Sequence, residues 1–283
     1  MFKKPETAFL HKEDKEIEHQ KAEEDAKTLK ELLRLVAKEL KQEGIPVRDN
    51  CRIEMDEFSD IYNVKEIERD KQEVSRIESL IDTKKITPEQ RLGEQLEMLK
   101  TGIFNKFLPD NFVTTRASRF DDIKNGADNV IIDRLNGNLV CALDEVGEIK
   151  GARFEAKKSQ VLHKNNKGGI FLKYALAIKN GQIVPSRAIQ NIPIFYLALS
   201  PEHVRKGVQA FISSADKPPS DYEKKIFDYF ISSIDAQIKA VELNSNLEKN
   251  LKKRVENFQD TINQIKEKLA SQASPGPASR RKT

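Results

Sequence analysis

Residues 119–158 read RFDDIKNGADNVIIDRLNGNLVCALDEVGEIKGARFEAKK. Two apolar runs in this stretch flank the dipeptide Asn136-Gly137, which is the strongest short-range signal for a β-hairpin. A two-residue type I′ turn at this dipeptide predicts strand partners whose residue numbers sum to 273. Asp128 is then expected to face Glu145, with the two Cβ atoms about 5 Å apart on one face of the hairpin. Carboxylates this close repel each other unless a cation or a shared proton lies between them, so the pair is a candidate metal site.

The composition limits the classes of protein that this chain can belong to. Of its 283 residues, 38% are hydrophobic and 33% are charged, so much of the charge has to lie on solvated helices or tails. Cys51 and Cys141 are the only cysteines, which excludes a disulfide framework and a cysteine-based zinc site. The sequence has no apolar run of membrane-spanning length and no apolar core of a signal peptide near its start. These features predict a cytoplasmic protein with no membrane partner.

Charged helical segments are expected on both sides of a more apolar central region. The helical patterns cover residues 12–43 and 64–82 before it, and 221–243 and 245–270 after it. The last of these has apolar residues at steps of three, four and seven, which is typical of a coiled coil. We therefore expect four parts: a charged helical N-terminal extension at 1–86, a core at 87–215, a helical C-terminal region at 216–270 and a disordered basic tail at 271–283.

The central region has the signals of a mixed α/β fold. Thr87-Pro88 begins a strongly apolar helix, since it combines an N-cap with a proline at the first helical position. The elements expected after it are a strand at 112–116, the hairpin, a helix from Ala152 to about Lys164, strands at 170–178, 182–185 and 192–199, and a short helix ending near Ser213. The predicted class is α/β (α+β), with a mixed, mostly antiparallel sheet flanked by helices.

This order of elements resembles the core of the PD-(D/E)XK nuclease superfamily, in which a helix and three strands are followed by a helix and a strand. In that superfamily an acidic residue begins the second strand, and a (D/E)-x-K triplet ends the third. Here Asp128 begins the second strand, and Asp144 or Glu145 ends the third. The resemblance covers roughly residues 87–200 and implies a restriction-endonuclease-like core.

The resemblance implies metal-assisted hydrolysis of a phosphodiester in DNA or RNA. Asp128, Asp144 and Glu145 would hold Mg²⁺ or Mn²⁺, and Asp122 would add a ligand from the preceding loop, as could Asp121. Glu94 or Glu97 of the first helix could do the same. Hard oxygen ligands of this kind suit Mg²⁺, which binds through few carboxylates and lowers the pKa of a bound water.

The sequence departs from the superfamily pattern at the lysine, because Gly147 stands two residues after Glu145. The lysine has to come from elsewhere, from Lys150 in the loop or from Lys157 or Lys158 on the next helix. With Lys157, the expected catalytic residues are Asp128, Glu145 and Lys157. A relative that keeps the fold and has lost cleavage is equally consistent with these residues.

Two observations keep other functions open. Basic residues gather just after the hairpin and near the C-terminus, where a phosphate backbone would be attracted, although a solvated face explains them as well. The charged helices at 12–43 and 221–270 could instead bind each other, a second copy or a partner. The alternative to a nuclease is therefore a non-enzymatic interaction protein that assembles through these helices.

Overall fold

The structure is a computed structural model that describes residues 6–80, 88–135 and 139–273. Its elements in chain order are α1 (Glu6–Gln42), the 3₁₀ helix η1 (Met55–Phe58), α2 (Val64–Leu80), α3 (Pro88–Phe107), β1 (Phe112–Arg116), α4 (Arg119–Asn125), β2 (Asn129–Asp133), β3 (Leu139–Val146), α5 (Ala152–Asn166), β4 (Ile170–Leu172), β5 (Ala175–Lys179), β6 (Gln182–Ser186), β7 (Ile189–Ile192), β8 (Ile194–Ala198), α6 (Pro201–Ser213), α7 (Asp221–Glu242) and α8 (Lys249–Ala273). The expected cap at Thr87, the turn at Asn136-Gly137 and most of the tail at 271–283 lie outside the described residues.

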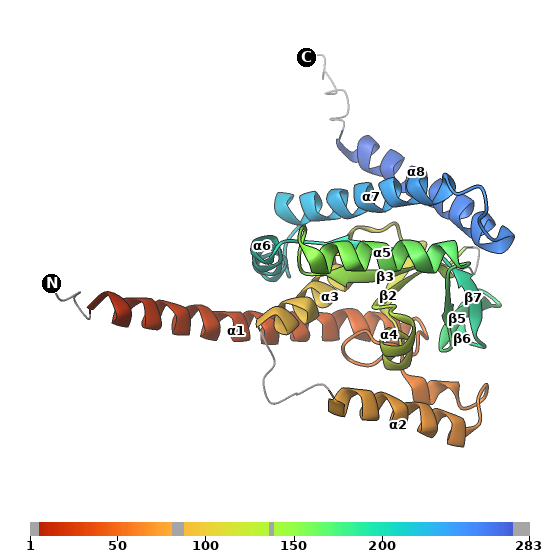
Figure 1. Cartoon of the computed structure of the whole chain (residues 1–283), viewed down its shortest axis with the longest axis horizontal. Coiled ribbons are helices and arrows are strands. Elements are labelled where there is room, and N and C mark those ends of the chain that lie inside the picture. Colours follow the sequence, from red (N-terminus) through yellow and green to blue (C-terminus); the bar gives the residue numbers. More distant parts are fainter. Residues whose placement is uncertain (1–5, 81–87, 136–138, 274–283) are drawn as a thin grey trace, which may run out of the picture.

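The main sheet has four strands in the order β1-β2-β3-β8. β2 runs antiparallel to both β1 and β3, and β8 runs parallel to β3. In Figure 1 α5 lies in front of β3, and α7 and α8 lie above the sheet. α3 packs on the face opposite to α5, where Lys100 binds Glu145 and Phe104 contacts Phe227 of α7. The predicted class, a mixed and mostly antiparallel sheet flanked by helices, is confirmed.

The strand expected at 170–178 is two short strands, and neither joins the main sheet. β4 pairs with β7, and β5 pairs with β6. The break falls at Lys173 and Tyr174, whose backbone amides donate to the two carboxylate oxygens of Asp121 at 2.7 and 3.0 Å. A buried side chain therefore takes the amides that a continuous strand would have given to a neighbouring strand.

The apolar run expected as one strand at 192–199 is also divided. β7 ends at Ile192 and β8 begins at Ile194, so Pro193 separates a strand of the small β4-β7 sheet from a strand of the main sheet. Proline has no amide hydrogen to give to a ladder. Its carbonyl oxygen accepts a hydrogen bond from the amide of Ala142 at 2.9 Å, which begins the parallel pairing of β3 and β8.

The expected hairpin forms, but its register differs from the one that a type I′ turn predicts. Ile131 pairs with Cys141 and Val130 with Ala142, so the partner numbers sum to 272, and the register shifts again between Ile131 and Ile132. The expected sum of 273 is therefore wrong. A shift of one residue exchanges the faces of a strand, and this decides which carboxylate lies beside Asp128.

The charged N-terminal segment contributes to the same hydrophobic core as the rest of the chain. Leu29, Leu33 and Ala37 of α1 are fully buried, and Phe58 of η1 is buried with them. α7 and α8 add their own apolar faces to this core, which extends to Ile265. The segments expected at 1–86, 87–215 and 216–270 thus share one core.

Gly169, between α5 and β4, is expected to tolerate no side chain. Its φ is +85°, and a Cβ there would lie 2.6 Å from the carbonyl oxygen of Ile192. Gly169→Ala should lower the free energy of unfolding by about 2–4 kcal/mol, because the left-handed conformation costs about 1–2 kcal/mol and the clash adds to it. Urea unfolding measures the change. Gly181→Ala is the matched control, since Gly181 has φ +76° and open space around it. An equal loss in both variants would contradict the role of the clash.

Candidate active site

Asp128 lies one residue before β2, and its backbone fixes its place on the sheet. Its amide donates to the carbonyl of Leu143 at 2.9 Å, and the amide of Glu145 donates to its Oδ2 at 2.9 Å. Asp128 is held between these two residues of β3, so the register continues with Asp128 opposite Asp144. The residue opposite Asp128 in the backbone register is therefore Asp144, and not Glu145 as expected.

Asp144 is bound by a lysine of α5. Lys157 Nζ donates to both carboxylate oxygens of Asp144, at 2.7 and 2.9 Å. The Asp144 side chain is 3% exposed and the Lys157 side chain 26%, so the amine lies at the rim of the site. The structure thus brings together Asp128, Asp144 and Lys157 of the sequence hypothesis.

Glu145 follows Asp144 in β3 and binds a lysine of a different helix. Consecutive side chains of a strand alternate between faces, and Glu145 forms an ion pair with Lys100 of α3, whereas Asp144 meets α5. The Lys100 side chain is fully buried and that of Glu145 is 7% exposed. The backbone register places Asp128 opposite Asp144 and not opposite Glu145, but the Asp128 and Glu145 carboxyls still interact, since burial and the Asp128 charge raise the pKa of Glu145 well above its usual value.

The expected loop at Asp121 and Asp122 is the helix α4, capped by the Ser118 side chain. Asp121 is buried and accepts hydrogen bonds from the Ser118 hydroxyl, the Asn125 amide and the backbone of Lys173 and Tyr174. Its position is structural, and it offers no free oxygen to a metal ion. Asp122 Oδ2 instead accepts from Arg52 at 2.8 Å and from Arg119 at 2.7 Å.

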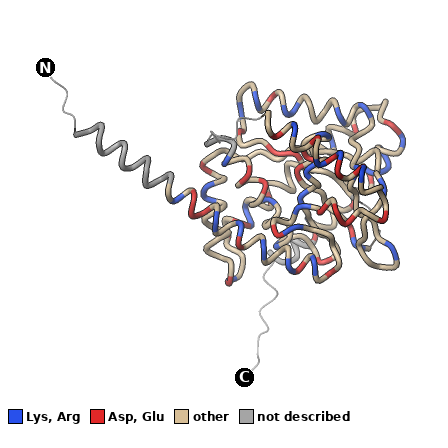
Figure 2. Tube along the Cα trace, turned by 90° about the horizontal axis from the view of Figure 1, so that it is seen from below, with Lys and Arg blue, Asp and Glu red and all other residues tan. Residues whose placement is uncertain are grey.

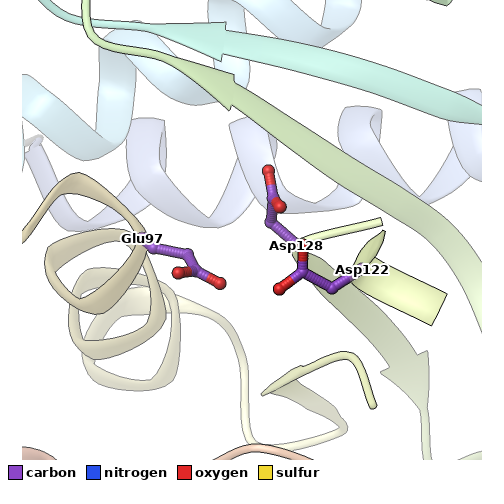
Figure 3. A group of neighbouring side chains, drawn as sticks. All are labelled: Glu97, Asp122 and Asp128. Carbon is purple, nitrogen blue, oxygen red and sulfur yellow. The ribbon is translucent and has the colours of Figure 1, made fainter. Parts of the chain in front are cut away.

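Glu97 of α3 completes a group of three carboxylates with Asp122 and Asp128. One oxygen from each lies within 4.8 Å of the others. Figure 3 shows Glu97 reaching from its helix toward Asp122 and Asp128 on the opposite side. Two buried arginines already bind this group: Arg52 bridges Glu97 and Asp122, both at 2.8 Å, and Arg116 donates to Glu97 at 2.5 Å. Glu94, the other candidate on this helix, pairs with Lys30 at the surface.

The carboxylates of the site differ in the direction of their pKa shifts. Burial and the nearby Asp144 charge raise the pKa of Asp128 to about 6. Burial raises the pKa of Asp122 to about 6 as well, against the opposing effect of Arg52. For Glu97, burial alone would raise the pKa, but Arg116 and Arg52 hold it below its usual value. Among Glu97, Asp122 and Asp128, only Asp128 has no ion pair with an arginine among the described residues.

Lys157 remains a cation in this surrounding. Burial would lower its pKa, but the charge and hydrogen bonds of Asp144, together with the charges of Asp128 and Glu145, raise it. Lys164, seven residues further along α5, donates to the carbonyl of Asn125 at 2.9 Å, and burial lowers its pKa. Lys158 is exposed and pairs with Glu155, and Lys150 is exposed in the loop before α5. Of the three lysines that the sequence left open, Lys157 is the one that contacts a carboxylate of β3.

Sequence reasoning did not find Lys100, Arg52 or Arg116, each of which binds a carboxylate near the site. Lys100 had one signal, because it is a charged residue within a strongly apolar helix. Arg52 gave none, since its partners Glu97 and Asp122 lie 45 and 70 residues further along the chain. In the part of the chain that Figure 2 colours, Lys and Arg are interspersed with Asp and Glu.

The terminal helices pack their apolar residues against the chain itself. In α1, Leu29 and Leu33 are fully buried, as are Leu251 and Val255 in α8. The described parts of these stripes are therefore not available to a partner. Within the described residues, no helix is both long and apolar enough to cross a membrane.

Comparison of the chain with models of protein families, with curated proteins and with solved structures gives no match.

Proposed function

We propose that this protein is a metal-dependent phosphodiesterase acting on nucleic acid, with Asp128 and Asp144 as ligands of a divalent cation and Lys157 as the cation that binds the substrate phosphate. The observation that carries the proposal is the contact of Lys157 with both oxygens of Asp144, beside Asp128 at the adjoining end of β2. Two carboxylates and a lysine of three different elements converge there without an arginine between them.

The topology supports the same reading. The order α3, β1, β2, β3, α5, β8 follows the helix, strand and helix order of the PD-(D/E)XK core, with α4 and the strands β4 to β7 inserted. Asp128 stands at the start of the second strand and Asp144 near the end of the third. Gly147 cannot supply the lysine, and Lys157 of the next helix provides an amine to the strand carboxylate instead.

The residues fit Mg²⁺ or Mn²⁺. Asp128 and Asp144 offer carboxylate oxygens, and Mg²⁺ binds through one or two carboxylates while it keeps several waters. Glu97 and Asp122 are less suitable, because Arg52 and Arg116 would remain as buried cations beside a metal ion. Glu145 is engaged with Lys100 of α3.

Each residue then has a definite part in hydrolysis. A bound divalent ion would lower the pKa of a water and stabilise charge on the phosphate oxygens. Asp128 and Asp144 fix the position at which the phosphate binds, and the Glu145 amide holds the Asp128 carboxylate in place. Lys157 is protonated, so it offsets the charge that develops on the phosphate rather than accepting a proton.

Asp144→Asn and Lys157→Ala should each lower the rate of Mg²⁺- or Mn²⁺-dependent cleavage by about 100-fold or more, because each removes a charge that acts on the transition state. The measurement is cleavage of single-stranded and duplex DNA and RNA oligonucleotides by the purified protein. Lys158→Ala is the matched control, since this neighbouring lysine is exposed and pairs only with Glu155. Thermal unfolding of each variant verifies that it is folded. Cleavage that persists unchanged in Asp144→Asn would refute the assignment.

A further inference from the structure

An aromatic residue lies directly beside the carboxylate of β3. In the parallel pair of β3 and β8, Asp144 is the partner of Tyr196. Partners in neighbouring strands project to the same face of a sheet, so Tyr196 lies on the Asp144 face. Phe154 of α5 meets the Tyr196 ring at a centroid distance of 5.7 Å and an angle of 82°. Phe154 precedes Lys157 by three residues, which places both on one side of the helix.

An apolar cleft continues from these rings. Its volume is about 310 Å³, at the lower end of the range of about 300–1,000 Å³ for ligand pockets. It is lined by Ile149, Ala198, Tyr222 and Tyr229, among others. Ala198 follows Tyr196 by two residues in β8, so it faces the same side of the sheet. The cleft therefore lies just beyond the carboxyl ends of the strands that carry Asp144 and Tyr196.

Two features of the cleft indicate the chemistry of its occupant. Tyr229 is 43% exposed, so a ligand in the cleft can reach its ring. The hydroxyl of Tyr222 is buried and has no hydrogen-bond partner among the described residues. Lys225 also lines the cleft, and Lys157 stands at the neighbouring rim, so cations flank an apolar space. A flat, apolar group with polar edges, attached to an anion, matches this arrangement.

We infer that the ring surface formed by Phe154, Tyr196 and Tyr229, which we call the aromatic ledge, together with the adjoining cleft, binds one unpaired nucleobase next to the phosphodiester at Asp144 and Lys157. The inference rests on the proposed function for the identity of the ligand as nucleic acid. Every base has a π-face that stacks on an aromatic ring, and such stacking tolerates many sequences. A base within a duplex is already paired and stacked, so the preferred substrate is single-stranded or has an unpaired end.

The test measures binding apart from cleavage. A single-stranded oligonucleotide with one fluorescent adenine analogue is titrated with protein in Ca²⁺, which takes oxygen ligands of the same kind. Wild type and Tyr229→Phe should quench the analogue and bind with similar affinity. Tyr229→Ala should bind about tenfold more weakly with less quenching, in line with the loss of one stacked base. Phe171→Ala is the matched control, because Phe171 of β4 is a similarly exposed ring at 38%. It should bind as wild type does.

The outcomes separate this inference from the proposed function. Unchanged binding and quenching in Tyr229→Ala, equal affinity for a duplex of the same sequence, or no binding by wild type would each overturn the aromatic ledge. Cleavage that is as fast on an abasic strand as on a normal one would overturn it too, and would leave the phosphodiesterase intact. Base-dependent binding without any hydrolysis in Mg²⁺ or Mn²⁺ would support the aromatic ledge and overturn the proposed catalysis.

Discussion

Lys100→Met is expected to lower the free energy of unfolding by about 3–5 kcal/mol at pH 8, because it leaves the buried Glu145 carboxylate without its cation. Lys100 is fully buried and its only hydrogen bond among the described residues goes to Glu145. The second oxygen of Glu145 is also buried and has no hydrogen-bond partner there. For a domain of ordinary stability, about 5–15 kcal/mol, such a loss removes a large fraction of the total.

The pH dependence follows from the Glu145 carboxyl. Burial and the charge of Asp128 raise its pKa well above the usual value even in the intact protein. A folded-state pKa above the unfolded value means that the folded protein binds the proton more tightly. The variant is therefore more stable at low pH, and it loses stability as pH rises above the unfolded value of about 4.3. The deficit of Lys100→Met should be smaller at pH 5 than at pH 8.

Removal of both partners provides the control. Lys100→Met combined with Glu145→Gln has no buried charge left, and replacement of a buried ion pair by neutral groups is often close to neutral. Urea unfolding at pH 5 and pH 8 should show that the double variant regains most of the lost stability at pH 8. A double variant as unstable as Lys100→Met would mean that the packing of the lysine chain, and not its charge, supports α3 on the sheet.

Asp128→Asn is expected to abolish metal-dependent cleavage and at the same time to stabilise the metal-free protein at neutral pH. The folded-state pKa of Asp128 is about 6, raised by burial and by Asp144, against an ordinary value of 3.8. The stability that this difference contributes is present below pH 4 and is lost as pH rises through 6. Well above pH 6 the ionised carboxylate costs about 3 kcal/mol. Asparagine removes the charge and keeps an oxygen that can accept from the Glu145 amide.

Thermal or urea unfolding of the metal-free protein measures this effect. At pH 7.5 the variant should be more stable than wild type by about 3 kcal/mol, and the two should converge near pH 4. Addition of Mg²⁺ should stabilise wild type more than the variant, because the ion binds the folded site. Asp110→Asn serves as the control, since Asp110 is exposed in the turn before β1 and should change little. A destabilised Asp128→Asn at pH 7.5 would show that the carboxylate supports the fold instead of straining it.

Local sequence signals were sufficient for those elements that depend on local interactions. The strand at 112–116 has the bounds that were expected, and α5 begins at Ala152 as expected. The hairpin register was wrong because the shift between Ile131 and Ile132 has no signature in the residues themselves. The strand at 170–178 was wrong because its amides bind Asp121, which lies 52 residues earlier in the chain.

In the candidate site, too, local signals identified some residues, but the placement of the residues depended on tertiary packing. Asp128, Asp144 and Lys157 were named from turn chemistry and from a resemblance that implied a lysine on the helix. Their relative placement depended on the register, which no periodicity in the sequence determines. For this reason Glu145 was expected as the backbone partner of Asp128, where the structure has Asp144. The ion pairs of Arg52 and Arg116 with Glu97 form only when α3, α4 and the segment before α2 pack together, so the sequence alone does not show them.

The hydrogen bonds of Asp121 give the inserted strands a mechanical role. The carboxylate of α4 is joined to the backbone at the junction of β4 and β5, and the next residue, Asp122, belongs to the group around Asp128. The inserted strands thus fix the position of α4 through Asp121, and α4 in turn fixes the position of the Asp122 carboxylate. A shortened chain without β4 to β7 would leave the Asp121 carboxylate buried without two of its amide donors, and α4 would lose its anchor. The insertion is therefore a part of the framework of the site, and a minimal catalytic core would have to retain it.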